Sequence, residues 1–135
     1  MFKPETEILV VDDMMVMRKI VVRALKEFGL SKVIEADDGS TAWAKLQDIF
    51  NAGNKIDLII SDWNMPQMKG IELLKNVRAD ARMKGIPFIM VTAENEKEII
   101  IEAVHAGVSH YVVKPVSPAT LEIKLKEVYA KHQKK

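Results

Sequence analysis

The sequence predicts an α/β domain in which a parallel sheet is covered by helices on both faces. Two observations support this prediction: five short apolar runs recur along the chain, and a helical pattern of apolar residues follows each run. Three of the runs lack any polar alternation, which indicates strands that are buried on both faces. A strand–helix unit repeated five times favours a parallel sheet with right-handed crossovers.

The five predicted strands are, in chain order, residues 8–11 (ILVV), 33–36 (VIEA), 58–61 (LIIS), 88–91 (FIMV) and 111–113 (YVV). The helix after the first strand is predicted from Met17 onward, and Gly29 is a natural stop. Ser117 followed by Pro118 predicts the start of the last helix. The apolar positions that mark the five helices are Ile20, Val21, Ala24, Leu25 and Phe28; Ala42, Leu46 and Ile49; Ile71, Leu74 and Val77; Ile100, Ala103 and Val104; and Leu121, Leu125, Val128 and Tyr129.

Composition limits the class of protein. The 135 residues are 48% hydrophobic and 29% charged with a net charge of +1, which is typical of a globular domain and lacks the basic excess of a nucleic-acid binder. No apolar stretch is long enough to span a bilayer, and the first residues contain no apolar signal core. The chain has no cysteine, which suits a reducing cytoplasm. We expect one cytoplasmic domain over residues 1–135, with no output domain and no nucleic-acid or membrane partner.

Polar residues follow four of the predicted strands. Asp12 and Asp13 come after the first strand, Asp62 after the third, Thr92 after the fourth and Lys114 after the fifth. Ligands of open parallel sheets bind outside the carboxyl ends of the strands, where the strand order reverses. The sequence therefore predicts that three carboxylates, a hydroxyl and an ammonium group meet at one edge of the sheet.

This set of groups has a chemical logic. Three carboxylates in one crevice repel one another unless a cation neutralises them, and Mg²⁺ is suited to such a set with waters and phosphate oxygens. Lys114 and Thr92 resemble a phosphate clamp of one charge and one hydroxyl donor. An aspartate beside Mg²⁺ can attack phosphorus and form an acyl phosphate. Asp62, which is set apart from the Asp12–Asp13 pair, is the natural nucleophile.

The segments VVDDMMVMRK, SDWNMPQMKG, VTAE and YVVKP resemble the receiver domains of two-component response regulators. Among them the chain is most similar to the standalone chemotaxis receivers of the CheY type, and the resemblance covers essentially the whole chain. It implies the flavodoxin-like (βα)5 fold, a doubly wound sandwich with strand order 2-1-3-4-5. It also implies a Mg²⁺-dependent phosphoacceptor signalling protein rather than an enzyme with its own substrate.

The resemblance also implies roles for individual residues, and each of these roles is an expectation. Asp62 would be the phosphoacceptor, Asp12, Asp13, Asp62 and the backbone carbonyl of Asn64 would bind Mg²⁺, and Lys114 would contact the phosphoryl group through a loop with a cis Lys114–Pro115 peptide. Thr92 and Tyr111 would form the switch, and Asn64 and Glu94 would tune dephosphorylation. The output face would include Ile100, Tyr111 and Lys124. Because Ile99, Ile100 and Ile101 are consecutive on a helix, at least one of them should be exposed.

The implied partners are a histidine kinase as phosphodonor, a flagellar motor switch protein as target and a phosphatase, and we expect a monomer. Four residues depart from the usual CheY-type pattern, and they leave the identity of these partners open: Lys69, Met14, Val116 and Glu127.

The sequence leaves several alternatives open. The chain could be a single-domain phosphorelay intermediate or a phosphate sink instead of a motor regulator. An aspartate-nucleophile phosphatase would need a carboxylate two residues after Asp62, where the chain has Asn64. A flavin-binding protein would need a phosphate-cradling loop after the first strand, where the sequence is DDMM. An unphosphorylated interaction module would have no use for the complete acidic and lysine set.

Overall fold

The computed structural model describes residues 1–93 and 97–133 of the chain. Strands and helices alternate strictly, as the sequence predicts. They are β1 (Ile8–Val11), α1 (Met15–Glu27), β2 (Val33–Ala36), α2 (Gly39–Asn51), β3 (Leu58–Asp62), α3 (Gly70–Ala79), β4 (Phe88–Thr92), α4 (Lys97–His105), β5 (His110–Val113) and α5 (Pro118–Gln133). The boundaries differ slightly from those predicted: β3 and β4 each continue by one residue, β5 begins at His110, and α1 begins at Met15.

All five strands are parallel and follow the order β2-β1-β3-β4-β5, which confirms the predicted flavodoxin-like topology. The chain leaves β1 toward β2 on one side and later returns to place β3 on the other side of β1. The strand order therefore reverses next to β1, and a crevice is expected outside the carboxyl ends of β1 and β3.

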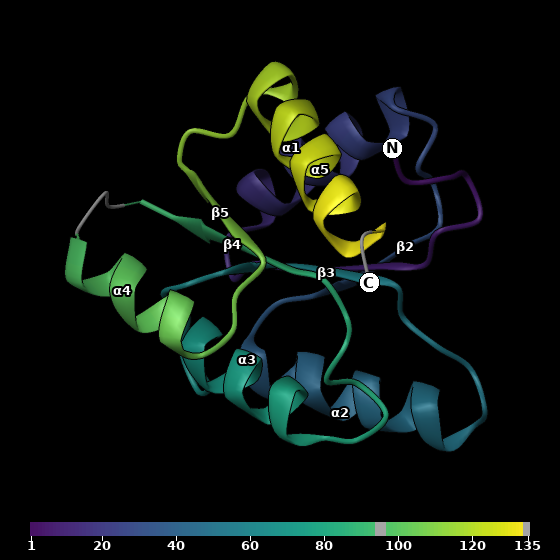
Figure 1. Cartoon of the computed structure of the whole chain (residues 1–135), viewed down its shortest axis with the longest axis vertical. Helices are drawn as coiled ribbons and strands as arrows, with labels where there is room; N and C mark the ends of the chain where they lie inside the picture. The colour runs from purple at the N-terminus through teal and green to yellow at the C-terminus, as the bar shows by residue number, and fades with distance from the viewer. Residues whose placement is uncertain (94–96, 134–135) are drawn as a thin grey trace.

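Helices cover both faces of the sheet: α1 and α5 lie on one face, and α2, α3 and α4 lie on the other (Figure 1). Alternate residues of each strand point to opposite faces, so Ile8 and Val10 pack in the core with α1 and α5, whereas Leu9 and Val11 pack in the core with α2 and α3. Every residue of β1, β3 and β4 is buried, which confirms the interpretation of the uninterrupted apolar runs.

Local sequence explains where the helices begin and end. The side chain of Asp38 accepts a hydrogen bond of 2.7 Å from the backbone N–H of Thr41 and caps α2. Ser117 does the same for α5, where its Oγ accepts from the backbone N–H of Thr120 at 3.1 Å. Gly29, with φ of 80°, follows the last turn of α1 in a conformation that glycine adopts without strain. Within the described residues, no helix has the length and apolar character that crossing a membrane requires.

Candidate functional site: an acidic pocket at the carboxyl edge of the sheet

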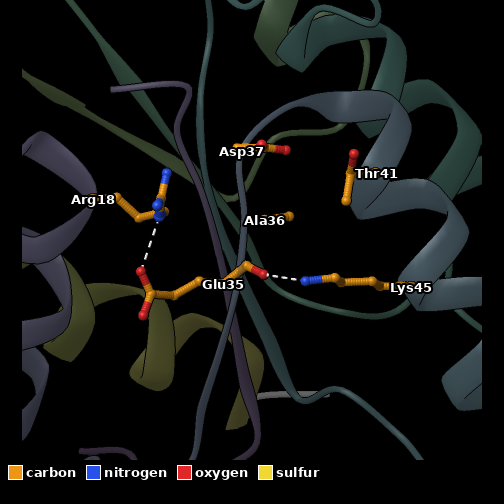
Figure 2. A pocket seen from close by; sticks show the side chains of 6 residues that line it. All are labelled: Arg18, Glu35, Ala36, Asp37, Thr41 and Lys45. Atoms are coloured by element: carbon orange, nitrogen blue, oxygen red, sulfur yellow. Dashed lines mark hydrogen bonds and ion pairs between the residues drawn. The ribbon is translucent and has the colours of Figure 1, made fainter. Parts of the chain in front are cut away.

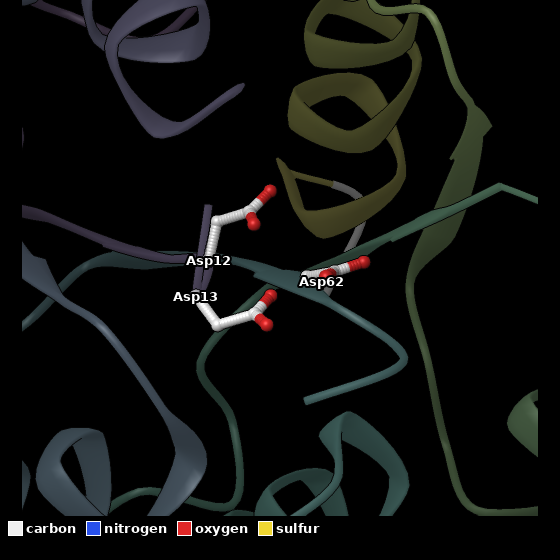
Figure 3. A group of neighbouring side chains, drawn as sticks. All are labelled: Asp12, Asp13 and Asp62. Atoms are coloured by element: carbon white, nitrogen blue, oxygen red, sulfur yellow. The ribbon is translucent and has the colours of Figure 1, made fainter. Parts of the chain in front are cut away.

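Three carboxylates meet outside the carboxyl ends of β1 and β3, as the sequence predicts. Asp12 and Asp13 follow β1 directly, and Asp62 is the last residue of β3 (Figure 3). One carboxylate oxygen from each residue lies within 4.8 Å of the others. Asp12 and Asp62 are each only 4% exposed, whereas Asp13 is exposed at the mouth of the cluster. Carboxylate oxygens at this spacing are a suitable ligand set for a hard divalent cation that keeps part of its hydration shell.

Lys114 reaches the same cluster from the loop after β5. Its Nζ lies 3.1 Å from Oδ1 of Asp62 and 3.6 Å from Oδ2 of Asp12. The Lys114–Pro115 peptide is cis, which confirms the expectation from the resemblance. The backbone N–H of Lys114 also donates to the carbonyl oxygen of Thr92 at 2.8 Å, so the lysine loop is joined to the end of β4.

Burial raises the pKa values of the two buried carboxylates, and the charge of Lys114 does not fully offset this effect. Burial raises the pKa of Asp12 above its ordinary value, against the hydrogen bond from the backbone N–H of Met14 and the charge of Lys114. Burial is also the largest cause that raises the pKa of Asp62, and the charge of Asp12 is the next. Lys114 again acts in the opposite direction. The buried carboxylates thus carry an electrostatic cost that a bound cation or a proton would relieve.

Thr92 and Asn64 flank the cluster. Thr92 ends β4 and is 3% exposed, which confirms its predicted place at the strand end. Asn64 is exposed two residues after Asp62, and the side chains of Asn64, Thr92 and Trp63 line one small pocket. Glu94, the other residue expected to tune dephosphorylation, lies outside the described residues.

The residues expected on the output face are partly brought together. Nζ of Lys124 lies 5.4 Å from the centroid of the Tyr111 ring, which joins α5 to β5. Ile100 is half-buried, and its neighbour Ile101 is 45% exposed, so the prediction that at least one of the consecutive isoleucines is exposed is confirmed.

The four residues that depart from the usual pattern add no side chain to the acidic cluster, although the backbone N–H of Met14 donates to Asp12. Met14 is exposed at the start of α1, Lys69 is exposed before α3, and Val116 is buried in the core with α5. Glu127 is exposed on α5, where its Oε1 lies 3.3 Å from Nε2 of His110.

Two residues next to the pocket, one on α1 and one on β2, were not among the predicted site residues. Arg18 of α1 donates from Nη1 to the backbone carbonyl oxygen of Asp12 at 2.8 Å, and its Nε donates to Oε1 of Glu35 on β2 at 2.9 Å. The available signal was the glutamate inside the otherwise apolar run VIEA, because a charged residue within a strand calls for a partner.

The fold and the site together define a class of protein: a doubly wound parallel sheet whose strand ends bring three carboxylates and a lysine into one pocket suited to a divalent cation. Residues 8–126 match the family model described as response regulator receiver domain, and the chain belongs to this family. The family predicted from the sequence motifs is therefore confirmed.

Relatives and solved structures agree with this assignment. The chain is 47% identical over 123 residues to chemotaxis protein CheY-3 of Vibrio cholerae, covering 91% of each chain. It is 46% identical over 123 residues to chemotaxis protein CheY of Pseudomonas aeruginosa, covering 91% of this chain and 95% of the relative. Among solved structures, it is similar to Vibrio cholerae chemotaxis protein CheY4, with a TM-score of 0.81, 37% identity and coverage of 91% of this chain and 98% of that one.

Proposed function

We propose that the chain is a standalone, CheY-type response regulator that accepts a phosphoryl group on Asp62 and then changes its affinity for a downstream target. The observation that carries this proposal is the position of Asp62, a buried carboxylate at the end of β3 that lies within the acidic cluster and 3.1 Å from the Lys114 ammonium group. The 47% identity to CheY-3 of Vibrio cholerae over 91% of each chain supports the CheY-type character.

Asp62 is better suited to be the nucleophile than its two neighbours. The carboxylate of Asp12 already accepts the backbone N–H of Met14 at 2.9 Å, and Asp13 is exposed. Asp62 is also nearer to Lys114, whose charge would offset the charge on the phosphoryl oxygens during transfer.

In the proposed reaction, a carboxylate oxygen of Asp62 forms a bond to the phosphorus of a phosphohistidine. The bond between phosphorus and the imidazole nitrogen breaks, and its electron pair leaves with the imidazole of the histidine kinase. Asp12, Asp13, Asp62 and the carbonyl oxygen of Asn64 would hold Mg²⁺, which would neutralise the carboxylates and the phosphoryl oxygens. Lys114 would hold one phosphoryl oxygen, and the hydroxyl of Thr92 would donate to another.

The phosphoryl group would act as a switch through Thr92 and Tyr111. A hydrogen bond from Thr92 favours the protein conformation in which this hydroxyl lies inward, and the Tyr111 ring responds on the face that also includes Ile100 and Lys124. We propose a flagellar motor switch protein as the cytoplasmic target, with a phosphatase that ends the signal and Asn64 and Glu94 as the residues that tune dephosphorylation. Similarity to proteins named for chemotaxis favours this output over a phosphorelay intermediate or a phosphate sink.

The test is phosphorylation by acetyl phosphate with and without Mg²⁺, followed by intact mass under acid quench. We expect one phosphoryl adduct that requires Mg²⁺ and is lost in Asp62→Ala. The matched control is Asp37→Ala, because Asp37 is an exposed carboxylate after β2 at the same edge of the sheet. The proposal fails if neither acetyl phosphate nor beryllofluoride with Mg²⁺ changes the wild-type protein, or if Asp62→Ala is phosphorylated as wild type is.

A further inference from the structure

The exposed carboxylate of the cluster, Asp13, is held by its backbone alone. Unlike Asp12 and Asp62, its side chain makes no hydrogen bond or ion pair with any residue in the described parts of the chain. Its oxygen nevertheless lies within 4.8 Å of the other two carboxylates. The position of the Asp13 carboxylate therefore depends on how the backbone of Asp13 is held.

Arg18 holds the peptide group that joins Asp12 to Asp13. Its Nη1 donates to the Asp12 carbonyl oxygen at 2.8 Å, and that oxygen belongs to the Asp12–Asp13 peptide. Because a peptide group is planar, fixing its oxygen also fixes the direction in which the chain enters Asp13. On the other side of Asp12, its backbone N–H donates to the carbonyl oxygen of Ala36 at 3.1 Å, so the residue is anchored at both of its peptide bonds.

The guanidinium group of Arg18 is itself oriented by β2. Its Nε donates to Oε1 of Glu35 at 2.9 Å, and the side chain of Arg18 is only 15% exposed. The backbone of Glu35 is anchored in turn, because its carbonyl oxygen accepts from Nζ of Lys45 at 2.6 Å (Figure 2). Nζ of Lys19 lies 2.9 Å from the other carboxylate oxygen of Glu35.

We propose that Arg18 is a positioning residue of the cation site, which sets the geometry of Asp13 through the Asp12 carbonyl oxygen and is held in place by Glu35. This inference rests on the proposed function, since it concerns the Mg²⁺ site of that function. It assigns Arg18 a task that a lysine performs less well, because a guanidinium group can donate to a carbonyl and to a carboxylate at the same time.

The direction in which loss of Arg18 changes the Mg²⁺ affinity distinguishes a positioning role from an effect of charge alone. Removing a positive charge near an acidic pocket should, by charge alone, strengthen Mg²⁺ binding. Removing a group that positions a ligand should weaken it, typically by about 10-fold to 100-fold for groups that orient metal ligands. A weaker Mg²⁺ affinity after loss of Arg18 would therefore be opposite to the electrostatic expectation.

Lys19 provides a matched control. It carries the same charge, lies next to Arg18 on α1 and pairs with the same glutamate. In the structure its Nζ bonds only Glu35 among the described residues, whereas Arg18 also bonds the Asp12 carbonyl.

The experiment is a Mg²⁺ titration of the full chain without phosphodonor, followed by tryptophan fluorescence and by calorimetry. We expect Arg18→Met to raise the Kd for Mg²⁺ by about tenfold and Lys19→Met to change it by less than about twofold. Arg18→Lys and Glu35→Gln should give intermediate values and keep the inference testable if Arg18→Met does not fold. With acetyl phosphate, the phosphorylation rate of Arg18→Met should recover to within about threefold of wild type once Mg²⁺ saturates the site.

An unchanged or tighter Kd in folded Arg18→Met, or in Arg18→Lys if Arg18→Met does not fold, would overturn the inference, as would an equal loss in Lys19→Met. If one of these results is found while wild type binds Mg²⁺ and is phosphorylated, only this inference fails and the proposed function stands. If wild type neither binds Mg²⁺ nor accepts a phosphoryl group, the inference fails together with the proposed function.

Discussion

Replacing the buried carboxylate of Asp62 by an amide should stabilise the protein in the absence of a divalent cation. Asp62 and Asp12 are each 4% exposed and have oxygens within 4.8 Å of each other, and burial followed by the charge of Asp12 raises the pKa of Asp62. Asp62→Asn keeps the shape of the side chain and removes one of the repelling charges.

The size of this effect follows from opposing contributions. At an effective dielectric constant of about 20, repulsion from Asp12, whose oxygen lies within 4.8 Å, costs at least roughly 3.5 kcal/mol, and attraction to Lys114 at 3.1 Å contributes roughly 5 kcal/mol. Asp13 adds a weaker, more screened repulsion, so the charge interactions nearly cancel and the loss of hydration decides the sign. We expect Asp62→Asn to raise the free energy of unfolding by about 1–2 kcal/mol, which for a chain of this length raises Tm by roughly 4–8 °C.

The assay is urea and thermal unfolding in EDTA at about pH 7, with Asp37→Asn as an exposed control that should not change stability. Because the pKa of Asp62 is raised in the folded state, the folded wild type binds its proton more readily than the unfolded chain does. Wild type therefore gains stability as pH falls through that raised pKa. The difference in the free energy of unfolding between Asp62→Asn and wild type should shrink toward about pH 4. Saturating Mg²⁺ should shrink it too, because a cation that binds the folded wild type stabilises it. An Asp62→Asn protein that is less stable than wild type in EDTA at neutral pH would refute this reasoning.

Two further predictions concern the same edge of the sheet. A Cβ added at Gly70 would overlap the backbone carbonyl oxygen of Asp62 at the end of β3. Gly70→Ala should therefore lower the free energy of unfolding, measured in urea, by about 1–3 kcal/mol. Gly85→Ala is the control and should be close to neutral, because a Cβ at Gly85 would meet open space. Lys114→Met should lower the rate of phosphorylation by acetyl phosphate by about 100-fold while tightening Mg²⁺ binding, because it removes the ammonium group from both the phosphoryl oxygens and the carboxylates. A mass-spectrometric time course and a Mg²⁺ titration check this pair of opposite effects, and a variant with the wild-type rate would exclude Lys114 from transfer.

The sequence by itself determined the order of strands and helices, the parallel sheet and the residues at its carboxyl edge. These features are encoded locally: the uninterrupted apolar runs mark strands buried on both faces, and residues such as Ser117 and Gly29 mark helix ends. Because parallel strands present their carboxyl ends at the same edge, the residues after each run could be assigned to one site before any distance was known.

The tertiary structure decided which of these groups are buried, how close they lie and what holds them. Arg18 and Glu35 are 17 positions apart and meet only because β2 pairs with β1 beneath α1, a contact that no local pattern encodes. The exposure of Ile101 was likewise settled by the way α4 rests on the sheet, since the helical period allows several orientations for three consecutive isoleucines. Side-chain contacts between distant segments depend on packing, and packing is a property of the whole folded chain.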